Sequence, residues 1–214
     1  MRRNGRLGLA LVILVAGLMG VALPAQADPI FDLTSDHCSG GCGPAGTIFG
    51  TVTVTQSGTS VNFDVHLNSP FAFANTGAVD GLAFKFNATG IVLSDITVTQ
   101  TVPGQTLAAV GPGSFTGDGT GFFAWGIQCT TCGGGLSTAF TNDILFTIAN
   151  ATVADVTAAN TSGNIFVADV GNTLTGATGP IDANHAVPEP GSLLFFGPLM
   201  ALAWMVGVRR WKRQ

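Results

Sequence analysis

Hydrophobic and polar positions alternate most regularly between residues 48 and 67. In the first arm every second position is a threonine: Thr51, Thr53 and Thr55. After a turn containing Gly58, the apolar side chains again occupy every second position: Val61, Phe63, Val65 and Leu67. Period-2 alternation on both sides of a glycine-containing turn is typical of a β-hairpin with one buried face. We therefore predict a hairpin over Ile48–Leu67 that buries Phe63 and leaves Asn62 and Asp64 outside.

Shorter apolar runs, separated by glycine and proline clusters, follow along the chain. The further predicted strands are Leu82–Phe86, Ile91–Thr99, Gly121–Ile127, Asp143–Ala149, Thr152–Thr157 and Asn164–Val170. No interior window combines a 3.6-residue period with helix caps. The pattern predicts an all-β fold, an antiparallel β-sandwich of jelly-roll or Ig-like type, over residues 28–171. Residues 28–46 are predicted to form turns, and the small, polar residues 172–186 a linker.

The first 27 residues have the three parts of a secretory signal peptide. Met1–Arg6 is basic, and Leu7–Val21 is an unbroken apolar run. Ala25 and Ala27 then place small residues at the spacing of a signal peptidase site. We predict cleavage after Ala27, so that the mature protein begins at Asp28. An uncleaved membrane anchor is the alternative.

The other end of the chain combines a short motif, an apolar segment and a basic cluster. The motif is Pro188, Glu189 and Pro190, and the mostly apolar segment is Ser192–Val208. The basic residues are Arg209, Arg210, Lys212 and Arg213. As a helix the apolar segment measures about 25 Å, near the lower limit for a single hydrophobic transmembrane helix. Basic residues stay on the cytoplasmic side of a membrane, so we expect the body to lie outside.

This order of elements resembles the PEP-CTERM sorting signal of Gram-negative bacteria. The resemblance covers residues 187–214 and implies processing near the motif by exosortase, a membrane protease-transpeptidase. It also implies transient anchoring in the inner membrane and a final place at the cell surface or in the extracellular matrix. Proteins sorted in this way tend to accompany exopolysaccharide, biofilm or floc formation. An ordinary single-span anchor is the alternative, and neither reading assigns a role to the body.

The charge distribution excludes one class of partner. Of the 8 lysines and arginines, only Lys85 lies between the signal peptide and the sorting tail, and residues 28–187 hold 11 aspartates and no glutamate. Binding a phosphate backbone requires several basic side chains that displace its counterions. The sequence therefore predicts no nucleic-acid partner.

The four cysteines form two close pairs in the sequence. They are Cys38, Cys42, Cys129 and Cys132. In an exported chain this number predicts two disulfides, with local and crossed pairings both open. Zinc binding with His37 as a further ligand is one alternative. Redox chemistry is another, although the three glycines after Cys132 disfavour the helix start that lowers a thiol pKa.

No catalytic motif is present. Gly-x-Ser-x-Gly does not occur, and Glu189 in the sorting motif is the only glutamate. The body therefore has neither a His-Glu-x-x-His site nor a glycosidase pair of glutamates. His66 falls on the polar side of a predicted strand. We predict a protein without catalytic residues, metal or cofactor.

Evenly spaced threonines occur in two runs, Thr51–Thr55 and Thr97–Thr101. Such runs resemble the ice-binding surfaces of some antifreeze proteins, although a half-exposed sheet also favours outward-facing threonine without any ligand. The sequence favours an exported, non-catalytic surface or matrix protein that offers hydroxyls, amides and carboxylates to exopolysaccharide. A secreted enzyme acting on matrix polymers is the main alternative, and an ice-binding protein is the other.

Overall fold

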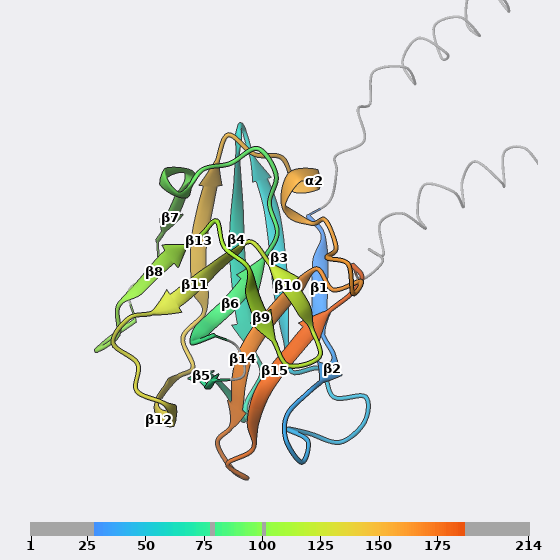
Figure 1. Ribbon diagram of the computed structural model, residues 1–214, viewed down its shortest axis with the longest axis vertical. Coiled ribbons are helices and arrows are strands. Elements are labelled where there is room, and N and C mark those ends of the chain that lie inside the picture. Colours follow the sequence, from blue (N-terminus) through green and yellow to red (C-terminus); the bar gives the residue numbers. More distant parts are fainter. Residues whose placement is uncertain (1–27, 78–79, 100–101, 187–214) are drawn as a thin grey trace, which may run out of the picture.

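The computed structural model describes residues 28–77, 80–99 and 102–186, which form two main sheets of antiparallel strands (Figure 1). The predicted signal peptide, sorting motif, apolar segment and basic cluster lie outside these residues. Within the described part of the chain, no helix has the length and apolarity to cross a membrane. The prediction of an all-β, antiparallel fold is confirmed.

The first sheet, called sheet A, has five strands in the order β1-β3-β4-β13-β7. Their bounds are β1 (Ile30–Leu33), β3 (Gly50–Ser57), β4 (Ser60–Leu67), β13 (Ile144–Ala149) and β7 (Ile96–Val98). The predicted hairpin is β3–β4, with Val54 opposite Phe63. Buried and exposed side chains alternate along β4, so the predicted buried face is also correct. The regular alternation is a consequence of one face packing on the core while the other faces solvent.

The second sheet, called sheet B, is built around β14 (Phe166–Asn172). Along one edge of β14, β6 (Leu82–Phe86) pairs with its first half and β5 (Phe71–Asn75) with its second half. Along the other edge lies β15 (Thr178–Ala183). The remaining strands of sheet B are β11 (Trp125–Cys129), β8 (Leu107–Val110), β12 (Gly135–Phe140) and β2 (Ser35–Asp36).

An aromatic cluster joins the two sheets. Phe63 of sheet A stacks on Phe146 of the same sheet, with ring centroids 4.4 Å apart. It also meets Phe86 and Phe166 of sheet B at 5.6 and 5.8 Å. Burying each large apolar side chain contributes roughly 1.5–3 kcal/mol, so this cluster is a main source of cohesion between the sheets.

Three sequence-based assignments are wrong. The predicted linker 172–186 contains β15, whose side chains are almost all buried. The predicted turns of 28–46 include β1 and β2, which pair with β3 and β15. The predicted strand Thr152–Thr157 contains instead the short helix α2 (Val153–Val156). There the Asp155 carboxylate accepts hydrogen bonds from the Thr152 backbone N–H and hydroxyl, at 2.8 and 2.6 Å, which fix the start of a helical turn.

A small hairpin, β9 (Phe115–Gly117) and β10 (Gly121–Phe123), covers part of the outer face of sheet B (Figure 1). Phe123 packs there against Val167 of β14, apart from the main core. The remaining short element, the 3-10 turn η2 (Leu93–Asp95), precedes β7. The central strands of sheet B, β6 and β14, are therefore buried at every position, whereas the outer face of sheet A is open to solvent.

Candidate functional site

The outer face of sheet A carries aligned polar side chains, and we call it the polar face. Strand register places its residues in three rows across the sheet. The first row is Thr55, Asn62, Thr147 and Thr97; the second is Ile30, Thr53, Asp64 and Leu145; the third is Asp32, Thr51 and His66. All of these side chains are exposed or half-buried. Because strands lie about 4.8 Å apart, the five strands span about 19 Å.

The middle of the polar face is shallowly hollowed. A depression of about 210 Å³ is lined by the apolar residues Phe63, Leu145 and Phe146 and by the polar residues Thr53, Thr55, Asn62, Asp64, Thr99 and Thr147. The Thr147 hydroxyl donates to the Asn62 side-chain oxygen at 2.8 Å, which leaves the Asn62 amide hydrogens free to face outward. Hydroxyls, an amide and a carboxylate therefore converge on one small area that solvent can reach.

Charge on the polar face is acidic and concentrated at one end of β4. His66 Nδ1 lies 2.7 Å from a carboxylate oxygen of Asp143, and both side chains are accessible. Burial and the neighbouring Asp143 charge raise the pKa of Asp64, while His66 opposes the shift. The rows contain no lysine or arginine, so this surface is unsuited to binding anions.

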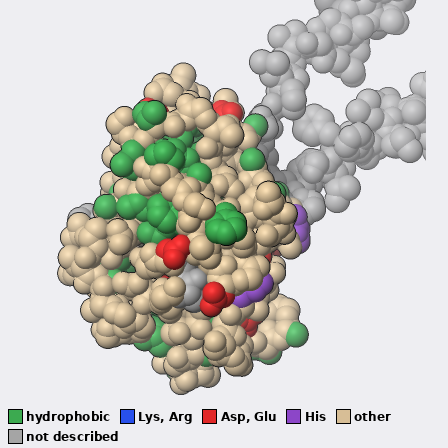
Figure 2. Space-filling view, in the orientation of Figure 1, with side chains coloured by type: hydrophobic (Ala, Val, Ile, Leu, Met, Phe, Trp, Pro, Cys, Tyr) green, Lys and Arg blue, Asp and Glu red, His purple; other side chains and the backbone are tan. Residues whose placement is uncertain are grey.

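A second group of polar side chains lies on the opposite side of the molecule, buried beneath the β9–β10 hairpin. We call Lys85, Asp169 and Asp182 the buried polar layer; each is at most 1% exposed. Register places Lys85 and Asp182 on either side of Val167, on the face of sheet B away from the core. Figure 2 shows this side of the molecule with acidic and histidine side chains but no blue, as expected for a covered lysine.

Lys85 holds the hairpin in place. Its Nζ donates to the backbone carbonyl of Thr116 in β9, and the Thr116 N–H donates to the Asp80 carboxylate at 2.6 Å. Burial lowers the pKa of Lys85 to about 8, while the nearby charges of Asp80, Asp169 and Asp118 oppose the shift. The ammonium thus remains the main form at neutral pH and is balanced by surrounding carboxylates.

The two buried aspartates are held by hydrogen bonds from neighbouring loops. Asp169 accepts from the Thr76 N–H at 2.5 Å and from its hydroxyl at 2.9 Å, yet burial raises its pKa to about 6. Asp182 lies 2.7 Å from His37 Nε2, and burial raises its pKa as well. Its Oδ1 has no hydrogen-bond partner among the described residues. Since these groups are closed off by the hairpin, we interpret the layer as structural.

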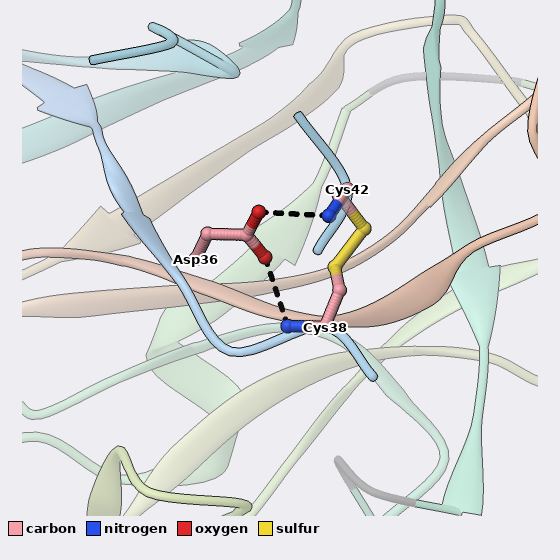
Figure 3. A group of neighbouring side chains, drawn as sticks. All are labelled: Asp36, Cys38 and Cys42. Carbon is pink, nitrogen blue, oxygen red and sulfur yellow. Dashed lines mark hydrogen bonds between the residues drawn. A yellow bond between two sulfur atoms is a disulfide. The ribbon is translucent and has the colours of Figure 1, made fainter. Parts of the chain in front are cut away.

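The N-terminal cysteine pair forms a local disulfide, Cys38–Cys42. Figure 3 shows the Asp36 carboxylate beside it, accepting the backbone N–H groups of Cys38 and Cys42 at 2.9 and 2.7 Å. The three side chains lie within 4.8 Å of one another, as metal ligands often do. However, the sulfurs are bonded to each other and the carboxylate already satisfies backbone donors. The group therefore stabilises a loop, and the zinc alternative does not fit it.

The second pair forms the local disulfide Cys129–Cys132 at the end of β11. The predicted disulfides are thus confirmed, and the open pairing is resolved in favour of two short bridges. His37, considered as a zinc ligand, contacts Asp182 instead. A glycine-rich turn, and no helix, follows Cys132 in the structure.

Threonines that are distant in the sequence lie close together on sheet A. Thr97 and Thr99 of the second threonine run lie on the polar face with the first run, because Thr97 of β7 aligns with Thr147 and, through Asn62, with Thr55. The sequence did not predict the buried polar layer, although a single lysine inside the apolar strand Leu82–Phe86 could have indicated it.

Comparison of the chain with protein-family models, curated proteins and solved structures finds no match.

Proposed function

We propose that the protein is an exported, non-catalytic component of the cell surface or extracellular matrix that contacts exopolysaccharide through the polar face of sheet A. The single observation that carries this proposal is the alignment of hydroxyl, amide and carboxylate groups in three accessible rows. A polysaccharide chain presents many hydroxyls along an extended line, and a flat row of donors and acceptors can pair with several of them at once.

The chemistry of the face favours a neutral polymer. An anionic polymer would meet Asp32, Asp64 and Asp143 without any lysine or arginine in the rows to balance its charge. No aromatic side chain is exposed in the rows, so hydrogen bonds would supply most of the affinity. Each bond contributes about 0.5–1.5 kcal/mol net, and the proposal therefore requires several weak contacts acting together.

Affinity electrophoresis tests the proposal. The exported protein should be retarded in gels that contain the exopolysaccharide of the producing cells. The double variant Asn62→Leu/Thr147→Leu, which removes the central polar pair, should migrate almost freely. Thr161→Val changes an exposed threonine on another side of the molecule and should be retarded like the parent. Equal retardation of all three proteins would refute binding through this face, and shortening of the polymer would favour a secreted enzyme.

The proposal includes the sorting pathway suggested by the two ends of the chain. Signal peptidase and exosortase act as processing enzymes, and the apolar segment Ser192–Val208 anchors the chain in the inner membrane as a helix before processing. The finer description of the body, a jelly-roll or Ig-like β-sandwich, is supported by two sheets that share one core. The two disulfides of the body support export to an oxidising compartment outside the cytoplasm.

Ice binding is the second candidate, favoured by one observation: Thr97 and Thr99 of the second threonine run lie on the same accessible face as the first run. Asn62 and Asp64 on β4 interrupt the array of threonines and favour the sugar-binding proposal. Thermal hysteresis of the purified body separates the two candidates, since a polysaccharide-binding face gives none.

A further inference from the structure

A cavity of about 390 Å³ lies at one end of the two-sheet body, where three segments meet. It is lined by the end of β4 and the following loop to β5, by Thr141 before β13, and by Thr173 after β14. This volume lies within the range typical of small-molecule sites. His66 belongs both to the cavity and to the third row of the polar face, so the two surfaces are continuous.

The cavity is lined by both apolar and polar residues, and we call the polar ones its rim. Pro70 is half-buried and supplies accessible apolar surface, whereas Leu67 and Phe71 are buried. The Phe71 ring packs against Phe49 in the core, with ring centroids 4.9 Å apart. The rim residues are His66, Asn68, Ser69, Thr141 and Thr173. A sugar ring has the matching distribution, with carbon-bound hydrogens on its faces and hydroxyls around its edge.

Several rim groups retain capacity for a ligand. His66 uses Nδ1 to contact Asp143, and no hydrogen bond involving its Nε2 occurs among the described residues. The Thr173 hydroxyl donates to the Pro70 carbonyl at 2.8 Å and keeps its lone pairs as acceptors. Asn68 donates to the Ile48 carbonyl through its amide nitrogen, which leaves its side-chain oxygen available. Donors and acceptors are therefore both present around the rim.

The cavity lies at the end of the body away from the start of the sorting tail. Thr173 is in the turn between β14 and β15, and β15 then runs six residues toward Ala183, near the end of the described chain. At about 3.3 Å per residue, the strand separates the two ends by about 20 Å. While the tail anchors the protein, this placement leaves the cavity open to the exterior.

From this geometry we infer that the cavity binds one neutral sugar ring of the polysaccharide, with Pro70 against the ring and His66, Thr141 and Thr173 around its hydroxyls. The inference rests on the proposed polysaccharide-binding function and adds a discrete subsite to it. A uronic acid is disfavoured because Asp143 lies beside His66, and Lys85, the only lysine or arginine among the described residues, is buried under the hairpin.

The test uses the full chain in a zwitterionic detergent without a sugar headgroup. Saturation-transfer NMR with methyl glycosides of glucose, galactose, mannose and N-acetylglucosamine, and with glucuronate, reports which sugar binds. We expect saturable binding of at least one neutral glycoside and none of glucuronate. Thr141→Trp should fill the cavity and weaken binding more than tenfold, and His66→Phe should weaken it several-fold. Thr161→Trp is the matched control and should bind like the parent.

The outcomes separate this inference from the function on which it rests. If polysaccharide retards the protein but no neutral glycoside binds, or if Thr141→Trp binds as well as the parent, the cavity inference is wrong and the polar face stands. If the parent is not retarded by polysaccharide at all, both the cavity inference and the proposed polysaccharide-binding function are wrong. Binding of glucuronate in preference to neutral sugars would also overturn the inference.

Discussion

Replacing the buried Asp169 carboxylate with an amide removes a charge and leaves the size of the side chain almost unchanged. In the parent protein this carboxylate accepts two hydrogen bonds from Thr76 but lies out of contact with solvent. Burial raises its pKa to about 6, from an ordinary value of 3.8. The variant Asp169→Asn therefore tests whether the buried polar layer is as closed as its geometry indicates.

The sign of the effect follows from proton linkage. Between pH 3.8 and about 6 the folded protein holds a proton on Asp169 that the unfolded chain has released. Lowering the pH through this window therefore stabilises the folded state, opposite to the usual effect of an acidic residue. At 1.36 kcal/mol per pKa unit, the contribution reaches about 3 kcal/mol. Asp182 and Asp64 shift in the same sense, so the parent and the variant must be compared at each pH.

The assay is urea unfolding of residues 28–186 at pH values from 3 to 7. The stability of Asp169→Asn relative to the parent should rise by about 3 kcal/mol between pH 3 and pH 7. Asp155→Asn is the contrasting control, because hydrogen bonds from Thr152 lower the pKa of that exposed carboxylate. Its loss of stability should be present at pH 7 and shrink below pH 4. A relative stability of Asp169→Asn that does not change with pH would show that Asp169 is solvated.

Three further predictions concern the core, the processing and the disulfides. Phe63→Asp should destabilise the body by at least about 4 kcal/mol in thermal melts, because it removes a ring from the aromatic cluster and buries a charge. Asn62→Asp, on the exposed face of the same strand, should change stability little. A larger loss of stability for Asn62→Asp than for Phe63→Asp would contradict the assigned register. The released protein should begin at Asp28 and lack the tail after the sorting motif in intact-mass measurements, and a secreted form that retains Trp211 would contradict exosortase processing. Non-reducing peptide mapping should find two local bridges, and four alkylatable thiols in the folded protein would refute them.

The parts of the fold that the sequence predicted are those with one buried and one exposed face. The β3–β4 hairpin was predictable because its side chains alternate as the pleat requires. Strand β14 is buried at every position, so its boundary could not be read from alternation. Strand β15 includes Gly179 and Pro180, which usually mark loops, yet it pairs with β14 on one edge and with β2 on the other. Its burial depends on neighbours that are distant in sequence.

The candidate sites were predictable only in part. The sequence identified outward-facing polar side chains on the hairpin, but not that Thr97 and Thr147 would complete their rows, since that depends on strand order. The contact between His37 and Asp182 joins residues 145 positions apart and has no local signal. The buried polar layer was missed because an aspartate in a short sequence window is ordinarily expected to be solvated. The cavity is formed by three segments that are separate in sequence, so it depends on the tertiary fold.

The most direct test of the polysaccharide-binding account is an NMR titration of residues 28–186, labelled at threonine methyl groups, with the exopolysaccharide of the producing cells. The account predicts that the signals of Thr51, Thr53, Thr55, Thr97 and Thr147 shift or broaden together. Signals of Thr116, Thr130 and Thr161, which lie elsewhere on the molecule, should stay unchanged and serve as internal controls. Perturbation confined to the control threonines, or no perturbation at saturating polymer, would contradict the proposed binding face.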